Sequence, residues 1–228
     1  MWTRLGAGPR GRRTGRGLVR PVEIPPAPAP DPFTDPLSVA VVAEMLDRGY
    51  AETTVAGVAS RAGVPVVDFR RRFRDLDHCA LDAYERGAAD FERRIGGAFN
   101  DHPDWQTALR AAAYEAVDWL REHAQMARFG NTELLRMRDE IAKVRREEVF
   151  RWCTELVERG REAAPDPDRL PEGTAIVAAG SFLQLFAVRQ QQGGELDLEA
   201  AVREALYAVV RTYLGEDAAR AELSLTRP

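Results

Sequence analysis

Apolar side chains recur with a helical period along almost the whole chain after residue 34. The first amphipathic stripe, within residues 35–50, consists of Leu37, Val41, Val42, Met45 and Leu46. Asp35 suits the N-cap of this helix, Pro36 its first turn and Gly49 its end. The pattern therefore predicts a helix that starts beside Asp35 and stops at Gly49.

Two short helices and a tight turn follow. Thr53 or Thr54 caps the first helix, and Gly63 makes the turn, where we expect a positive φ. Pro65 starts the second helix, and Asp75 caps the longer helix after it. The buried positions of the second helix are spaced i, i+3, i+7: Val66, Phe69 and Phe73.

Helical spacing continues to residue 214. It predicts helices over residues 76–95, 104–123, 124–137, 139–163, 174–191 and 198–214, with a Pro-rich linker at 164–174. We find no convincing strand pattern with a period of two. The sequence therefore predicts an all-α protein.

Composition narrows the class of protein. The chain has 228 residues, 45% hydrophobic and 30% charged, as is usual for a soluble globular protein. Its longest nearly uncharged apolar run, 175–188, is shorter than the roughly 20 residues that span a bilayer. Cys79 and Cys153 lie far apart without ligand spacing nearby, which argues against a disulfide framework or a zinc site. We expect a cytoplasmic protein without a membrane partner.

Charge is divided unevenly along the chain. The net charge is −4, yet residues 1–75 hold 12 Arg and 8 acidic residues, a net of +4, and residues 76–228 have a net of −8. This division favours a protein that places only its N-terminal part against phosphate.

Residues 1–34 are expected to be a disordered Arg- and Pro-rich tail. Their stretch "TRLGAGPRGRRTGRGLVR" has six Arg, five Gly and no acid, and "PVEIPPAPAPDP" follows it. The tail lacks the apolar core of a signal peptide. It is either a solvated extension, which a start codon assigned too far upstream would also explain, or a basic arm that adds phosphate contacts.

Residues 36–80 resemble the DNA-binding region of TetR-family transcriptional regulators. The matching features are Gly49-Tyr50, Thr53-Thr54-Val55, the Ala59…Ala62-Gly63-Val64 turn, and Phe69…Phe73. Residues 36–214 also follow the family's layout of three short helices, a connecting fourth helix and a larger helical domain. The resemblance implies a helix-turn-helix domain at 35–80, a ligand-binding and dimerisation domain at 81–215 and a C-terminal tail at 216–228.

A helix-turn-helix of this kind contacts DNA through the turn and the outer face of its second helix. The candidate DNA-binding residues are Thr53, Thr54, Pro65, Val66, Val67, Asp68, Arg70, Arg71, Arg72 and Arg74. The sequence departs from the family pattern, because Arg70 stands where a phosphate-contacting Tyr is usual and Leu76 where a Lys is usual. The four arginines between residues 70 and 74 are expected to restore the positive charge.

Two of these side chains have alternative roles. Asp68 either accepts a hydrogen bond from cytosine or pairs with Arg71 or Arg72 within its own helix. Val67 either contacts a thymine methyl group or is simply exposed.

Aromatic and Met side chains on the middle helices form either part of the core or the wall of a pocket for an apolar ligand. They are Trp105, Tyr114, Trp119, Met126, Phe129 and Trp152. The three histidines are scattered without metal-site spacing, and nucleophile and nucleotide-binding motifs are missing. We expect no catalytic residue, metal or cofactor.

The stretch at 174–190 is apolar nearly all round, and 198–214 has a matching apolar stripe. We predict that this pair of helices and the same pair of a second copy form a four-helix interface with two-fold symmetry. Its residues are Ile176, Ala179, Gly180, Leu183, Phe186, Val202, Leu206 and Val209. A dimer is what a helix-turn-helix needs to reach half-sites about 34–36 Å apart.

Two hypotheses follow. The first is a homodimeric, ligand-responsive transcriptional repressor that binds a palindromic operator; its partners are double-stranded DNA, a second copy and a small-molecule effector. The alternative is a related helical dimerisation or small-molecule-binding protein whose DNA-binding head has degenerated. We expect no enzymatic activity.

Overall fold

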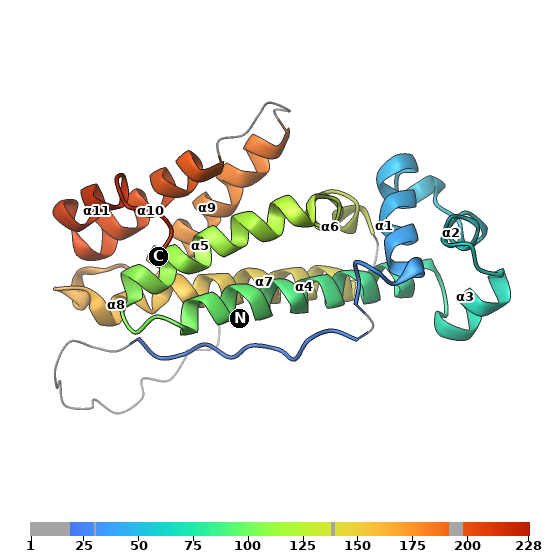
Figure 1. Cartoon of the computed structure of the whole chain (residues 1–228), viewed down its shortest axis with the longest axis horizontal. Helices are drawn as coiled ribbons and strands as arrows, with labels where there is room; N and C mark the ends of the chain where they lie inside the picture. The colour runs from blue at the N-terminus through green and yellow to red at the C-terminus, as the bar shows by residue number, and fades with distance from the viewer. Residues whose placement is uncertain (1–18, 30, 138–139, 192–197) are drawn as a thin grey trace.

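The structure, a computed structural model, describes residues 19–29, 31–137, 140–191 and 198–228; at residues 183, 186–191 and 198 it describes the backbone alone. Over these residues the chain is all-helical, as the sequence predicts. A small N-terminal head is joined by one long helix, α4, to an elongated body (Figure 1).

The head begins and ends its helices at residues that favour caps and turns. It consists of α1 (Pro36–Arg48), a 3-10 turn (Tyr50–Glu52), α2 (Val55–Ala62) and α3 (Val66–Arg72). The Asp35 side chain caps α1, and Thr54, not Thr53, caps α2 by accepting from the Gly57 N–H at 3.0 Å. Gly63 ends α2 at a φ of 69°, a left-handed conformation that a side chain would strain.

Two phenylalanines hold α3 in the head. Phe69 and Phe73 are buried, with their ring centroids 5.6 Å apart, and pack with Val58 and Met45 in one core. The predicted helical register of α3 is therefore confirmed for these two side chains. Val66, the third predicted inward residue, is exposed.

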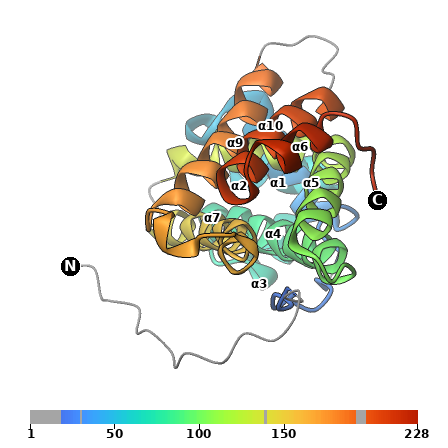
Figure 2. The ribbon, with the colours of Figure 1, turned by 90° about the vertical axis from the view of Figure 1, so that its left-hand side faces the viewer.

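The body contains α4 (Leu76–Asn100), α5 (Trp105–Glu122), α6 (Ala124–Asn131), a 3-10 turn (Leu134–Arg136), α7 (Glu140–Glu158), α8 (Gly160–Ala163), a 3-10 turn (Pro167–Arg169), α9 (Thr174–Gln191), α10 (Leu198–Leu214) and α11 (Glu216–Glu222). Viewed along the long axis, α5, α7, α9 and α10 are arranged around and above α4 (Figure 2). Among the described residues, no helix combines the length and apolarity needed to cross a bilayer.

Helix α4 belongs to both parts of the molecule. It has 25 residues and runs without a break through residues 80 and 81, so the domain boundary predicted there falls inside a helix. At 1.5 Å per residue it is about 37 Å long. Its first turns contact the head, and the rest forms one side of the body (Figure 1).

Residues 19–29 and 31–34, which belong to the predicted disordered N-terminal tail, contact the body in this structure, and we call them the strap. The strap runs along α4 in an extended conformation (Figure 1). Val22 is buried. Its N–H donates to the Asn100 side-chain oxygen at 2.8 Å, and its carbonyl accepts from the Asn100 side-chain N–H at 2.9 Å. The Trp152 Nε1–H donates to the Glu23 carbonyl at 3.2 Å.

Side chains at both ends of the strap also pack on the body. Ile24 covers Gly96 of α4, where an added Cβ would lie 2.2 Å from an Ile24 methyl carbon. Near the head, the Phe33 ring stacks on His123 at 3.5 Å between centroids. The strap was missed because its partners lie far away in the sequence. Residues 1–18 lie outside the described residues.

The predicted C-terminal tail is also part of the body. Its first residues form α11, in which Ala219 and Glu222 are buried. Glu222 accepts from Arg110 of α5 at 3.0 Å, and Arg227 pairs with Asp118 at 2.5 Å. The segment after residue 215 is therefore docked on α5.

Candidate DNA-binding surface and ligand cavity

The outer face of α3 is a solvent-exposed surface beside the Gly63 turn. Phe69 faces inward, whereas Val67 is 55% exposed and Asp68, Arg70 and Arg71 are also exposed. A short helix that buries one edge and presents cations on the other has the form of the second helix of a helix-turn-helix.

Arg70, Arg71 and Arg74 are exposed cations on or just after α3. Arg70 forms no ion pair with any residue that the structure describes. Arg71 pairs with Asp68 at 2.9 Å, one of the two roles considered for Asp68, and Arg74 pairs with Asp75 at 2.8 Å. Exposed pairs of this kind contribute only about 0–1 kcal/mol. Both arginines can therefore exchange their carboxylate partners for phosphate at little cost.

Arg72 is also exposed, but its guanidinium differs from those of Arg70, Arg71 and Arg74 because it binds a buried carboxylate of the head. Its guanidinium donates two hydrogen bonds to the buried Asp35 carboxylate, at 2.5 and 3.0 Å, and lies 4.8 Å from the Phe73 ring centroid. Burial by itself would raise the pKa of Asp35, but the hydrogen bonds from Arg72 and Ser38 outweigh it and lower that pKa. Arg72 therefore has a buried partner within the head, and a DNA contact by Arg72 stays a prediction.

The remaining candidates lie at helix starts. Thr53 is buried, and its hydroxyl donates to the Gly49 carbonyl at 2.8 Å, so it stabilises the preceding turn. Thr54 is exposed at the first turn of α2, and Pro65 is exposed at the N-cap of α3 with Val66 next to it. Thr54, Pro65 and Val66 are therefore accessible from solvent.

The head contacts the body through apolar side chains of the shared core and also through polar groups. Glu133, a buried carboxylate after α6, accepts from the Tyr50 N–H at 2.9 Å and from Arg136 at 2.8 Å. The Tyr50 hydroxyl donates to Asp77 of α4 at 3.1 Å. We call these contacts, together with the ion pairs around Asp35, the joint.

The body contains a partly open cavity of about 100 Å³ between five helices. Its lining is entirely apolar apart from one thiol: Phe91 and Ile95 from α4, Leu109, Ala112, Ala113, Ala116 and Leu120 from α5, Cys153, Leu156 and Val157 from α7, Ala179 and Phe182 from α9, and Leu206 and Val209 from α10. Burial raises the pKa of the Cys153 thiol to about 12, so it stays protonated at neutral pH.

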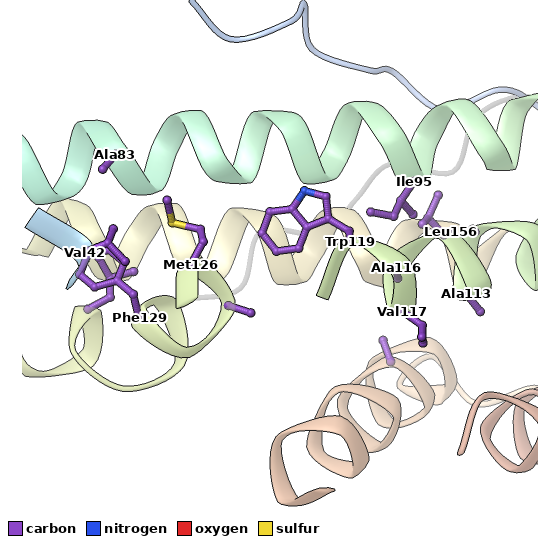
Figure 3. Close-up of a cluster of buried hydrophobic side chains, with 14 of the residues drawn as sticks. Val42, Ala83, Ile95, Ala113, Ala116, Val117, Trp119, Met126, Phe129 and Leu156 are labelled. Atoms are coloured by element: carbon purple, nitrogen blue, oxygen red, sulfur yellow. The ribbon is translucent and has the colours of Figure 1, made fainter. Parts of the chain in front are cut away.

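None of the six side chains predicted for the ligand pocket lines this cavity. Figure 3 shows Trp119 and Met126 against α4 and Phe129 beside Val42, all within the packed core. The indole nitrogens of Trp105, Trp119 and Trp152 donate to Leu156, Asp90 and Glu23. Tyr114 is also buried in the core. In this structure five of the six are core residues, and Trp152 is partly buried against them.

The predicted dimer residues fall into three groups. Val202, Leu206 and Val209 are at most 6% exposed, and Ala179 is also buried, so they pack inside one subunit and cannot form its outer surface. Ile176 is 52% exposed and Gly180 is half-buried, so both stay candidates. The side chains of Leu183 and Phe186 lie outside the described residues.

The sequence contained signals for the cavity and the joint that went unused. Four small or medium residues of the α5 stripe, Leu109, Ala112, Ala113 and Ala116, leave space where helices converge. Two charged residues of the joint, Asp35 before α1 and Arg86 on α4, stand at inward positions and are buried. A buried charge needs a partner.

Comparisons with known proteins establish the fold. No protein-family model matches the chain, and no curated protein matches its sequence. Similar solved structures include the fatty acid degradation regulator FadR from Bacillus halodurans, with a TM-score of 0.67 and 18% identity over 77% of this chain and 97% of that one.

Two further structures agree. A transcriptional regulator FadR from Bacillus subtilis, in complex with stearoyl-CoA, has a TM-score of 0.61 and 16% identity over 78% of this chain and 97% of that one. A TetR-family transcriptional regulator from Streptomyces coelicolor has a TM-score of 0.53 and 21% identity over 80% of this chain and 99% of that one. The chain therefore has the fold of TetR-type transcription regulators, the family that residues 36–80 resemble.

Proposed function

We propose that the protein is a ligand-responsive, DNA-binding transcription regulator that acts as a homodimeric repressor on a palindromic operator. The observation that carries this proposal is the exposed face of α3. Arg70 and Arg71 on this helix, and Arg74 just after it, present positive charge beside the turn of the helix-turn-helix. Phosphate contacts from such cations position the helix, and the exposed Val67 and Asp68 are available to base edges in the major groove.

The direct test is salt-dependent binding to the DNA upstream of the protein's own coding sequence. Because a single phosphate contact contributes about 0.9 to the slope of log K against log salt, Arg70→Gln and Arg71→Gln are each expected to reduce that slope by about one unit. Arg169→Gln, on a distant exposed arginine paired with Asp166, is the matched control. Unchanged affinity and slope in both head variants would exclude this docking.

For the effector we propose a molecule with a hydrocarbon chain, such as a fatty acyl group. The support is the apolar lining of the cavity and the stearoyl-CoA in the B. subtilis FadR structure. At about 100 Å³ the cavity is smaller than the roughly 150 Å³ that admits benzene in another protein, so a chain of this kind enters only as the helices move apart. Such movement would favour a conformation with lower affinity for DNA.

Titration with stearoyl-CoA, followed by tryptophan fluorescence and by DNA affinity, tests the effector class. Binding that weakens the DNA complex supports the proposal. Free coenzyme A is the control for the headgroup, because it has no chain to enter the cavity. If stearoyl-CoA and stearic acid both fail to bind, a hydrocarbon effector is excluded even if the DNA proposal stands.

For the dimer we propose the exposed face of α9, which presents Ile176 and Val177 at 52% and 70% exposure. Apolar side chains exposed side by side on one helix are typical of a surface that a second copy covers. Sedimentation of Ile176→Glu tests this, because a charge there should dissociate the dimer.

The alternative, a degenerated head, is favoured by two observations. Arg71, Arg72 and Arg74 all have carboxylate partners, and Leu76 stands where the family usually has a Lys. Failure of the wild-type protein to enrich any sequence from random DNA, together with ligand binding in the body, would establish this alternative.

A further inference from the structure

The joint contains a cluster of four charges contributed by three helices. Asp35 precedes α1, Arg72 ends α3, and Asp82 and Arg86 lie on α4. Asp35 and Arg86 are buried, and the two carboxylates balance the two guanidiniums. Neither the exposed surface of α3 nor the cavity uses this cluster.

Asp35 is the centre of the cluster. Its carboxylate accepts from the Ser38 N–H at 3.0 Å, from the Ser38 hydroxyl at 2.6 Å, and from Arg72 at 2.5 and 3.0 Å. Two parallel bonds from one guanidinium fix an angle as well as a distance. Asp35 thereby links the start of α1 to the end of α3.

Arg86 extends the link to α4. It donates to the Ser38 hydroxyl at 2.6 Å and to the Asp82 carboxylate, and it lies 3.6 Å from Asp35. Asp82 in turn lies 4.0 Å from Arg72. A continuous polar path therefore joins α3, α1 and α4.

Because α3 is short, the orientation of this helix depends strongly on such a link. The helix has seven residues, and Phe69 is its only buried side chain. Burial of one ring and of the following Phe73 is favourable but not directional, so it constrains the tilt of α3 weakly. The guanidinium fork at the C-terminal end of α3 supplies the missing direction.

We propose that the Asp35–Arg72–Arg86–Asp82 cluster is a positioning device that sets the angle of α3 against α4, and that Arg72 acts through Asp35 instead of contacting phosphate. This inference rests on the proposed DNA-binding function. In a dimer, an error in that angle is made twice, because both helices must fit major grooves at a fixed separation. The cluster therefore makes binding selective for the spacing of the two half-sites.

The test uses full-length protein and a duplex that the wild type selects from random-sequence DNA. Affinity is measured across a range of salt concentrations for Arg72→Gln, Arg72→Lys, Asp35→Ser and the control Arg70→Gln. Serine keeps the N-cap of α1 but removes the charge. Each variant is also measured on the same duplex with one base pair inserted between the half-sites, after circular dichroism has shown that it is folded.

Positioning and phosphate contact give different results. Arg70→Gln should lower the salt slope by about 0.9. Arg72→Gln and Asp35→Ser should keep the wild-type slope, bind roughly tenfold more weakly and lose part of the preference for the original spacing, as expected for coupled neighbours. Arg72→Lys, which keeps the charge but not the fork, should fall between them and the wild type.

Three outcomes would overturn the inference in distinguishable ways. A slope loss in Arg72→Gln equal to that in Arg70→Gln would make Arg72 a phosphate contact. Wild-type affinity and spacing preference in Asp35→Ser would show that the cluster positions nothing. Failure of the wild type to enrich any sequence would instead overturn the proposed function, and the positioning role with it. If Arg72→Gln does not fold, Asp35→Ser and Arg72→Lys decide the question.

Discussion

The joint and the interior of the body are stabilised by opposite kinds of interaction. At the joint, Asp35, Arg72, Arg86 and Glu133 form short, directional hydrogen bonds between helices. Around the cavity, five helices meet through hydrocarbon side chains, and Cys153 contributes the one group there that is not purely hydrocarbon.

This difference separates the helices around the cavity, which can shift, from the helices at the joint, whose relative angle is fixed. Dispersion and hydrophobic contacts have no preferred angle, so helices lining a cavity can shift while most of their burial is kept. A bidentate ion pair loses its strength when the angle changes. The fold therefore places an adaptable interior beside a joint of fixed geometry, and α4 belongs to both.

The largest effect is expected from a charge placed in the apolar interior. Leu206→Glu buries an unpaired carboxylate beside the cavity and should cost more than about 4 kcal/mol, enough to unfold many domains. Thermal unfolding followed by circular dichroism measures the loss. Ile176→Glu, on the exposed face of α9, is the matched control and should keep the fold of the subunit. If the Leu206→Glu protein folds and only its sedimentation changes, α10 contributes to the dimer surface.

The joint should lose stability in acid. Burial would raise the pKa of Asp35, but its hydrogen bonds from Arg72 and Ser38 hold the folded pKa below the ordinary 3.8. Its contribution is therefore fully present above the unfolded pKa and disappears as the pH falls through the lower folded value. The loss should be smaller than the roughly 3–5 kcal/mol for deleting one partner of a buried pair.

Urea unfolding at pH values from 6 down to 2, with an Asp35→Ser comparison, measures this contribution. The variant should lack the part of the pH dependence that comes from Asp35, whereas the other carboxylates remain. Identical pH profiles for the two proteins would show that the Asp35 pair adds no stability to the joint.

Filling the cavity should have a smaller effect of opposite sign. Ala116→Leu places three more carbon atoms in apolar space and should stabilise the body by about 1 kcal/mol. It should also weaken binding of stearoyl-CoA, because the leucine side chain would occupy the space proposed for the hydrocarbon chain. Ala56→Leu, on the exposed side of α2, is a control for helix propensity. Greater stability with undiminished ligand binding would place the ligand elsewhere.

The smallest effect is expected at the exposed end of the strap. Arg20 pairs with Glu162 at 2.7 Å in solvent, so Arg20→Ala should change stability by less than about 0.5 kcal/mol. Asn100→Ala removes two hydrogen bonds from Val22 and should cost about 1 kcal/mol or more. Cleavage after Glu23 by a glutamate-specific protease should accelerate in Asn100→Ala and hardly change in Arg20→Ala. Equal rates in both would mean that Asn100 does not hold the strap.

Local signals explain why the head was predicted well. Asp35, Thr54 and Gly63 act on neighbours within four residues, and the spacing of Phe69 and Phe73 is a property of α3 alone. Information of this kind is present in any short window of the sequence.

What was missed depends on distant partners. Arg72 lies next to Arg71 on α3 and is also exposed, but it pairs with the buried Asp35, 37 positions earlier in the sequence. The pocket prediction favoured large side chains, whereas a cavity forms where small ones such as Ala113 and Ala116 meet other helices. The sequence of one helix shows neither the distant partner of Arg72 nor the point at which several helices meet.

The strap also imposes an order on folding. Its hydrogen bonds join residues that are 78, 129 and 142 positions apart, whereas most contacts in a helical protein are local. At a synthesis rate of roughly 5–20 residues per second, Glu23 leaves the peptidyl transferase centre about 6–26 s before Trp152 is made. The strap is therefore made well before its partners and reaches its native place only after α7 has been synthesised.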